Sequence, residues 1–149
     1  VAVSSERFIG ARAIWDATTL QEIYLVGTRQ DNIGLSAIGA RLQPTEDGQT
    51  GLRIRIGEGG TTVLAAIAPG IVSEVPVSQW SPIKVNEVIP IEFQPCTVAL
   101  DGERTFTLSE DELASVAIRE NGPLVVDVAS AMREATLAGA FGGSPAFSR

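Results

Sequence analysis

Residues 31–39 are the first candidate for chemistry, because this segment is unusually rich in small residues. Backbone N–H groups beside small residues are open to a ligand, which suits an anionic or heteroaromatic molecule. The side chains of Asp31 and Asn32 can also bond ribose hydroxyls or amide groups. The alternative is that the same residues serve only the tight packing of a turn. The residues assigned to this ligand site are Asp31, Asn32, Gly34, Ser36, Ala37 and Gly39.

Two pairs of arginines are the next candidates. Arg29 and Arg41 flank the small-residue segment, and a bound phosphate is expected beside one of them, because the net charge of −7 opposes phosphate elsewhere. Arg53 and Arg55 alternate within a strand-like run at residues 52–56, which puts both guanidinium groups on one face. Such a pair can hold a phosphate or a carboxylate. The alternative is the solvated outer face of a sheet.

Most catalytic sets are absent from the sequence. The chain has no histidine, which excludes histidine-based triads, histidine general bases and the usual zinc sites. It has neither a phosphate-binding P-loop pattern nor the G-x-G-x-x-G dinucleotide fingerprint. The single cysteine, Cys96, lies in an apolar run that is typical of a buried, unreactive thiol. No catalytic or metal-binding residue is therefore assigned.

The acidic composition excludes two classes of partner. The chain has 18 Asp and Glu against 11 Lys and Arg, and such a surface repels nucleic acid and anionic lipid. Neither nucleic acid nor a membrane is expected as a partner. One cysteine permits no internal disulfide and is typical of a reducing compartment, so a cytoplasmic location is expected.

Short β-like segments dominate the chain. Residues 95–108 predict a hairpin whose first arm is covered on both faces and whose two-residue turn is Asp101-Gly102. Further strands are expected at residues 7–15, 71–77, 88–93 and 113–119, and a second hairpin at 52–68 with its turn at 57–60. Pro76 predicts either an edge position or an end for its strand. The pattern predicts a mainly β fold, a β-sandwich with a short helix near each end.

The two expected helices lie at residues 17–26 and after Asp127. Leu20, Ile23 and Tyr24 have helical spacing, and Asp16, just before them, can cap a helix. Asp127 has the same role for the closing helix. A chain of 149 residues suggests one domain, at residues 1–141, followed by a flexible tail at 142–149.

Five runs of the sequence resemble a known family, in the same order and over nearly the whole chain. They are RFIGARAIWD at residues 7–16, IGLSAIG at 33–39, IAPG at 67–70, TVALDGER at 97–104 and VVDVA at 125–129. Together they resemble the C-terminal domain of the acetoin catabolism protein X group of NAD-kinase-like proteins. The resemblance implies a β-sandwich of the NAD kinase C-terminal domain type.

The resemblance also implies a function shared between two domains. In this family an N-terminal α/β domain carries a Gly-Gly-Asp-Gly-Thr motif that handles ATP phosphates, and the C-terminal β-sandwich completes the nucleotide site. The present chain lacks that motif, so it resembles the C-terminal domain alone and is not expected to transfer phosphate by itself. NAD or ATP is the ligand implied for the longer parent protein, and Asp101-Gly102 is implied as a weaker second wall of the site.

The partners expected from this interpretation are the N-terminal α/β domain, a nucleotide-like small molecule and further copies of the chain. A second hypothesis comes from a different class of function. The chain is then a self-associating structural or interaction module without catalysis, because its many apolar strands can leave an apolar face for a symmetric copy to cover.

Overall fold

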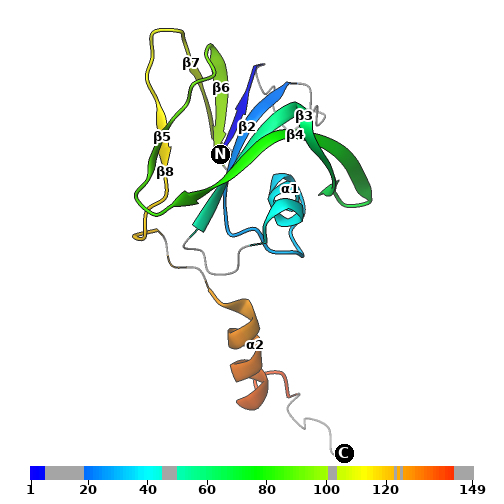
Figure 1. The fold of residues 1–149 in the computed structure, drawn as a ribbon. Coiled ribbons are helices and arrows are strands. Elements are labelled where there is room, and N and C mark those ends of the chain that lie inside the picture. The colour runs from blue at the N-terminus through cyan, green and yellow to red at the C-terminus, as the bar shows by residue number, and fades with distance from the viewer. Residues whose placement is uncertain (6–18, 45–49, 101–103, 123, 125, 143–149) are drawn as a thin grey trace, which may run out of the picture.

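A six-stranded antiparallel sheet is the centre of the fold in the computed structural model, which describes residues 1–5, 19–44, 50–100, 104–122, 124 and 126–142 (Figure 1). Its strands follow the order β4-β3-β2-β1-β6-β7. Their bounds are β1 Ala2–Ser4, β2 Leu20–Val26, β3 Thr50–Ala68, β4 Ile71–Lys84, β6 Cys96–Leu100 and β7 Arg104–Leu108. A smaller sheet pairs β5 (Val88–Pro90) with β8 (Ser115–Ala117). The mainly β prediction is confirmed.

Both faces of the large sheet are covered by apolar packing. On one face Ile23 and Ile54 pack against Ile38 of helix α1 (Leu35–Leu42), and all three side chains are fully buried. On the other face Tyr24 and Val98 belong to a second buried cluster, which includes Ile89 of β5. Adjacent residues of a strand point to opposite faces, so Ile23 and Tyr24 serve different cores. The sheet is thus the middle of a sandwich.

The expected helix at residues 17–26 is wrong, because Leu20–Val26 forms strand β2. Ile23 and Tyr24 are both buried, one on each face of the strand. A strand covered on both faces lacks the alternation of apolar and polar residues by which a strand is recognised in a sequence. The apolar spacing therefore fits a helix equally well. The first helix of the described chain is α1, which begins at Leu35 instead.

The expected hairpin at residues 52–68 is also wrong in its turn. β3 continues through residues 57–60 as an irregularity, since Ile56 and Thr61 both pair with Val77 of β4. The glycines make this possible: a Cβ on Gly60 would lie only 2.1 Å from the Val77 carbonyl oxygen. The chain instead reverses at residues 69–70, and β4 lies at the edge of the sheet, as Pro76 predicts.

Several other local predictions are confirmed, although the strands expected at residues 88–93 and 113–119 are shorter, as β5 and β8. β6 and β7 form the predicted hairpin, and Cys96 to Ala99 are buried, as a strand covered on both faces requires. Leu100 pairs with Arg104, which leaves three residues rather than two in the connection. Those residues include Asp101-Gly102 and, like the expected strand at 7–15, they lie outside the described residues. Asp127 caps helix α2 (Val128–Leu137) as predicted.

Candidate functional site

Residues 35–39 of the small-residue segment form the start of helix α1, and residues 31–34 form the turn before it. Gly34 is the N-cap residue, with a φ of 82° that favours glycine, and its N–H donates to the Ala66 carbonyl at 2.9 Å. Ala37 and Gly39 are buried against the sheet. A Cβ on Gly39 would lie 2.6 Å from side-chain atoms of both Leu25 and Thr28. These two small residues therefore let the helix approach the sheet closely.

Asp31 and Asn32 lie on the surface just before α1. The Arg29 guanidinium bonds the Asp31 carboxylate at 3.1 Å and holds the pKa of Asp31 below its ordinary value. The Asn32 amide donates to the Gly27 carbonyl at 3.2 Å, which fixes the turn. Ser36 is half-buried in the first turn of the helix. Asp31 is thus exposed, and Asn32, Gly34 and Ser36 are half-buried around the start of α1, while Ala37 and Gly39 are buried.

The pairing register locates the ends of the two strands that precede the expected walls of the site, residues 31–39 and Asp101-Gly102. Ile23 of β2 and Ala99 of β6 both pair with Ala2 of β1, and both strands run antiparallel to β1. β2 and β6 therefore run in the same direction, and their last residues, Val26 and Leu100, lie toward the same end of the paired strands. Asp101 and Gly102 lie outside the described residues.

A cluster of charged side chains occupies the opposite face of the sheet. Glu22 of β2 is paired with Arg55 of β3, and the next residues on that face, Tyr24 and Arg53, are also paired. Oε1 of Glu22 accepts from Arg53 Nη2 and Arg55 Nε, both at 2.8 Å. Oε2 of Glu22 accepts from the Tyr24 hydroxyl at 2.5 Å. A fifth residue, Glu92, follows β5 and contacts both arginines.

This cluster combines a buried carboxylate with an exposed one. The Glu22 side chain is 6% exposed, whereas that of Glu92 is 60% exposed. Burial, and then the bond to Glu22, raise the pKa of the Tyr24 phenol far above its ordinary value. The Nε atom of Arg53 is buried, and among the described residues it has no hydrogen-bond partner. The two arginines therefore satisfy Glu22 and still face outward toward a second carboxylate.

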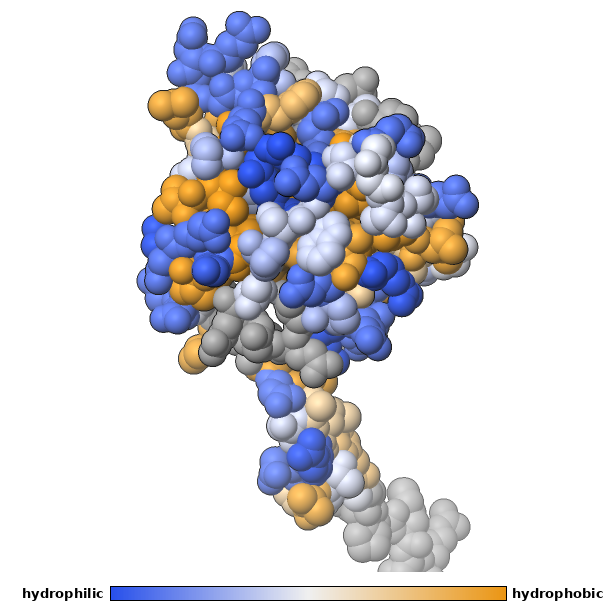
Figure 2. Space-filling model, in the orientation of Figure 1, coloured by the Kyte–Doolittle hydropathy of each residue, from blue (hydrophilic) through white to orange (hydrophobic). Residues whose placement is uncertain are grey.

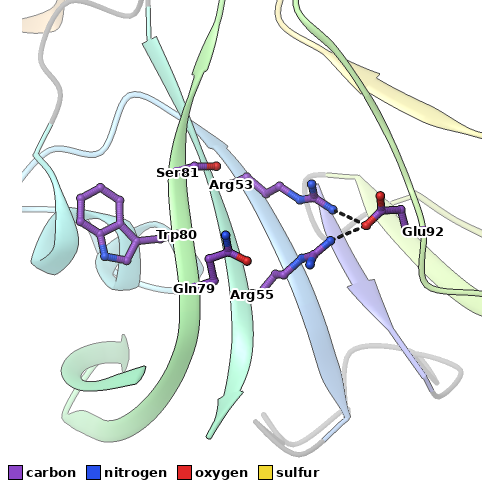
Figure 3. A pocket seen from close by; sticks show the side chains of 6 residues that line it. All are labelled: Arg53, Arg55, Gln79, Trp80, Ser81 and Glu92. Atoms are coloured by element: carbon purple, nitrogen blue, oxygen red, sulfur yellow. Dashed lines mark hydrogen bonds and ion pairs between the residues drawn. The ribbon is translucent and has the colours of Figure 1, made fainter. Parts of the chain in front are cut away.

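Two shallow cavities flank the contact between Arg55 and Glu92. Figure 3 shows the first, where both guanidinium groups converge on the Glu92 carboxylate; its volume is about 210 Å³. Gln79 and Ser81 line it from β4, and the indole of Trp80 points away from the arginines (Figure 3). The second cavity, of about 290 Å³, lies on the other side of Arg55. Its lining residues are Gln21, Glu22, Arg55, Ile56, Ser78, Glu92 and Phe93.

The sequence alone indicated two of the five residues of this cluster. The alternation of Arg53 and Arg55 predicted their shared face, where both contact Glu22 and Glu92 of the chain itself, and Arg53, at 17% exposure, does not lie on a fully solvated face. Glu22 was missed because residues 17–26 were interpreted as a helix. The signal that could have found it is the two-residue spacing of Glu22 and Tyr24, which in a strand puts both beside the arginines.

Other predicted features can be placed within the described residues. Cys96 is 5% exposed, as expected of a buried thiol, and burial raises its pKa. The described part of the chain contains no group of three histidine, cysteine, aspartate or glutamate residues that could hold a metal ion. None of its helices is both long and apolar enough to cross a membrane.

Fold and cluster together define a β-sandwich domain with a charge network built into one sheet face. Residues 1–121 match the family described as acetoin catabolism protein X C-terminal domain, and the chain belongs to that family. A relative named acetoin catabolism protein X, from Cupriavidus necator, is 37% identical over 139 residues. That match covers 89% of this chain but only 38% of the relative. No solved structure matches the chain.

Proposed function

We propose that this domain forms one wall of a nucleotide-binding site in a longer NAD kinase-like protein and transfers no phosphate alone. The observation that carries the proposal is membership of a family described as a C-terminal domain, in a chain that spans 38% of its relative's length. The resemblance to NAD kinases supplies the ligand class, which is ATP or NAD. The proposed partner is the N-terminal α/β domain of the longer protein.

The N-terminal end of α1, with Asp31, Asn32, Gly34 and Ser36, is the proposed point of contact. Its N-cap, Gly34, offers no side-chain cap, and the first turn of α1 has no acidic residue. The positive end of the helix dipole is therefore open to an anionic group. Arg29 lies beside this end, whereas Arg41 lies in the last turn of the helix. A nucleotide phosphate is accordingly placed beside Arg29, with Asp31 and Asn32 toward the ribose.

A pair of glycine variants tests this contact in the longer protein. Gly34→Ala and Gly70→Ala both put a side chain at a positive φ, 82° and 76°, and neither added Cβ meets an atom closer than 3.9 Å. Both variants strain the backbone, and Gly34, with a ψ of −153°, lies in a region that is essentially restricted to glycine, so each thermal shift is measured against the Tm of the same variant without ligand. ATP or NAD at 100 times its Kd should stabilise the unchanged protein by about 2.7 kcal/mol, seen as a thermal shift. We expect Gly34→Ala to lose most of the shift and Gly70→Ala to keep it.

Two results would count against the proposal. The first is an unchanged thermal shift in Gly34→Ala, which would place any nucleotide elsewhere. The second is the absence of a shift with ATP and with NAD in the unaltered longer protein.

A second candidate function, self-association, is favoured by the outer surface of the β3–β4 hairpin. Leu64, Ile71 and Val72 are each more than half exposed there. Figure 2 shows hydrophobic surface at the projecting end of this hairpin. Exposed apolar groups on an edge strand favour contact with another copy of the chain.

Light scattering on a charged variant tests this second candidate. Val72→Lys should lower the average mass of the particles if the hairpin joins copies of the chain. Leu113→Lys is the matched control, because Leu113 is 97% exposed and lies on neither strand of the hairpin. A monomeric unaltered protein at high concentration would count against self-association.

A further inference from the structure

We propose that Arg53 and Arg55 form a binding site for the carboxylate of a small organic acid, and that Glu92 occupies this site when the acid is absent. The site lies on the face of the sheet opposite α1, so it is separate from the nucleotide contact proposed above. Its occupant is assigned from the chemistry of the five side chains that meet there.

The two arginines already hold a carboxylate, that of Glu92. Oε2 of Glu92 lies 3.5 Å from Arg53 Nη2 and also accepts a short hydrogen bond from Arg55 Nη2. Two guanidinium groups thus converge on one oxygen from different positions along β3 (Figure 3). Arginine forks suit carboxylates in geometry as well as charge, so a ligand carboxylate can take the same place.

The two glutamates, Glu22 and Glu92, differ in how firmly they are held. Glu22 is buried, accepts three hydrogen bonds and cannot leave without stranding both arginines. Glu92 is 60% exposed and sits on a segment outside the sheet. Exposed ion pairs add little to stability, so turning Glu92 into solvent is inexpensive. With Glu92 displaced, Glu22 neutralises one arginine and leaves the site with a net positive charge.

The contact between Arg55 and Glu92 has open space on both sides. The two cavities, of about 210 and 290 Å³, share Arg55 and Glu92 in their linings. When Glu92 turns away, they join into one groove across β3. Gln79 and Ser81 make one end polar, while the other end is mixed: Ile56 and Phe93 add apolar surface beside the polar Gln21 and Ser78. A short acid with an apolar carbon chain fits this division.

Arg53 has a buried hydrogen-bond donor, its Nε. Its Nε has no hydrogen-bond partner among the described residues, although a buried donor left unpaired is costly. The guanidinium is therefore incompletely satisfied even with Glu22 and Glu92 in place. Because Nε itself is buried, a bound acid can bond it only when the Arg53 side chain moves, and otherwise reaches Nη2, which faces Glu92.

Titration of the 149-residue chain with butyrate, followed by backbone amide NMR shifts, tests the proposal. We expect shifts for residues 53–56 and 79–81, saturating at millimolar butyrate. Glu92→Gln removes the competing charge and should tighten butyrate binding about two- to fivefold. Arg55→Gln removes a charge-assisted donor and should weaken binding at least about tenfold. Arg104→Gln, the same charge change on exposed β7, is the matched control and should leave the affinity unchanged.

A second variant keeps the test decisive if Arg55→Gln unfolds. Arg55→Lys retains the charge that faces Glu22 but lacks the fork, and it should also weaken butyrate binding. Inorganic phosphate at equal ionic strength distinguishes a carboxylate site from a general anion site. The proposal is overturned if Glu92→Gln binds butyrate no more tightly, if Arg104→Gln weakens binding as much as Arg55→Gln, or if phosphate binds in the groove and butyrate does not.

Discussion

The two helices differ in what holds them, although their lengths are similar. α1 has eight residues, four of them buried, and its N-cap Gly34 makes no side-chain hydrogen bond. α2 has ten residues, none of them buried, and Asp127 caps it by accepting from the Ser130 N–H at 3.0 Å. In Figure 1, α2 stands away from the sheet while α1 lies against it. Capping marks where a helix begins, but packing decides whether the helix belongs to the core.

This difference agrees with the extent of the family match. The matched region ends at residue 121, before α2 begins. Neither buried cluster contains a residue beyond Ile118. A ten-residue helix without packing is marginal in water, because its nucleation cost is spread over few hydrogen bonds. We therefore expect the stability of the sandwich to be independent of α2.

Truncating one apolar side chain in each helix should give the largest contrast. Ile38 is 0% exposed, so Ile38→Ala leaves a cavity and should cost about 2–5 kcal/mol of unfolding free energy. Met132 is 52% exposed, so Met132→Ala should change that free energy by no more than about 0.5 kcal/mol. Urea unfolding followed by tryptophan fluorescence measures both. A comparable loss in the two variants would show that α2 does pack on the sandwich.

Enlarging a glycine should separate packing from ligand binding in the segment at residues 31–39. The Cβ of Gly39→Val would meet side chains of Leu25 and Thr28 at 2.6 Å, so overpacking should cost about 3 kcal/mol. Gly122→Val is the control, because nothing lies within 4 Å of an added Cβ there. Both are compared by urea unfolding. If Gly39→Val is as stable as Gly122→Val, the close contact of α1 with the sheet is wrong.

The sequence predicted α2 better than α1, and the reason is the range of the interactions. Asp127 acts on a backbone N–H three residues later, so its effect can be inferred from neighbours in the chain. α1 depends on contacts between Gly39 and Leu25, which meet only when the helix packs on strand β2. The small residues signalled close approach correctly, but not whether a ligand or the sheet approaches.

The charge cluster shows the same limit. The pairing of Arg53 and Arg55 follows from strand alternation, a local rule that the sequence displays. Glu22 and Glu92 come from segments 31 and 37 or more residues away, and only the register of β2 on β3 and the fold of the segment after β5 unite them. Burial on both faces of β2 hid its period, so the carboxylate that neutralises the arginines could not be assigned.

Alkaline pH should weaken the sandwich through Tyr24, which is the only tyrosine in the chain. Burial and the bond to Glu22 raise the pKa of its phenol above the unfolded value of 10.0. The folded state therefore keeps a proton that the unfolded state loses, so this stabilisation is full below pH 10 and declines as the pH rises further. Tyr24→Phe should cost about 2 kcal/mol at neutral pH and should reduce the decline.

Two measurements check the Tyr24 prediction. Tyrosinate absorbance reports this residue alone and should appear only well above pH 10 in the folded protein. Urea unfolding between pH 9 and 11 then gives the slope of stability in both forms, and Cys96→Ser accounts for the buried thiol, whose pKa is also raised. Ordinary titration of the phenol near pH 10 in folded protein would contradict its burial against Glu22.

Acid should melt α2 through Asp127, which is the smallest of these effects. The Ser130 N–H holds the pKa of Asp127 below its ordinary value, so the cap is present above that value and is lost as the pH falls. α2 has ten helical residues against eight in α1, so its melting removes more than half of the described helical signal at 222 nm. Asp127→Ala should lower this signal at neutral pH and remove its acid dependence, while the Tm of the sandwich changes by less than about 2 °C. Asp127→Asn is the control, because asparagine caps equally well without titrating. A helical signal in Asp127→Ala equal to that of the unaltered chain would mean that packing, and not the cap, holds α2.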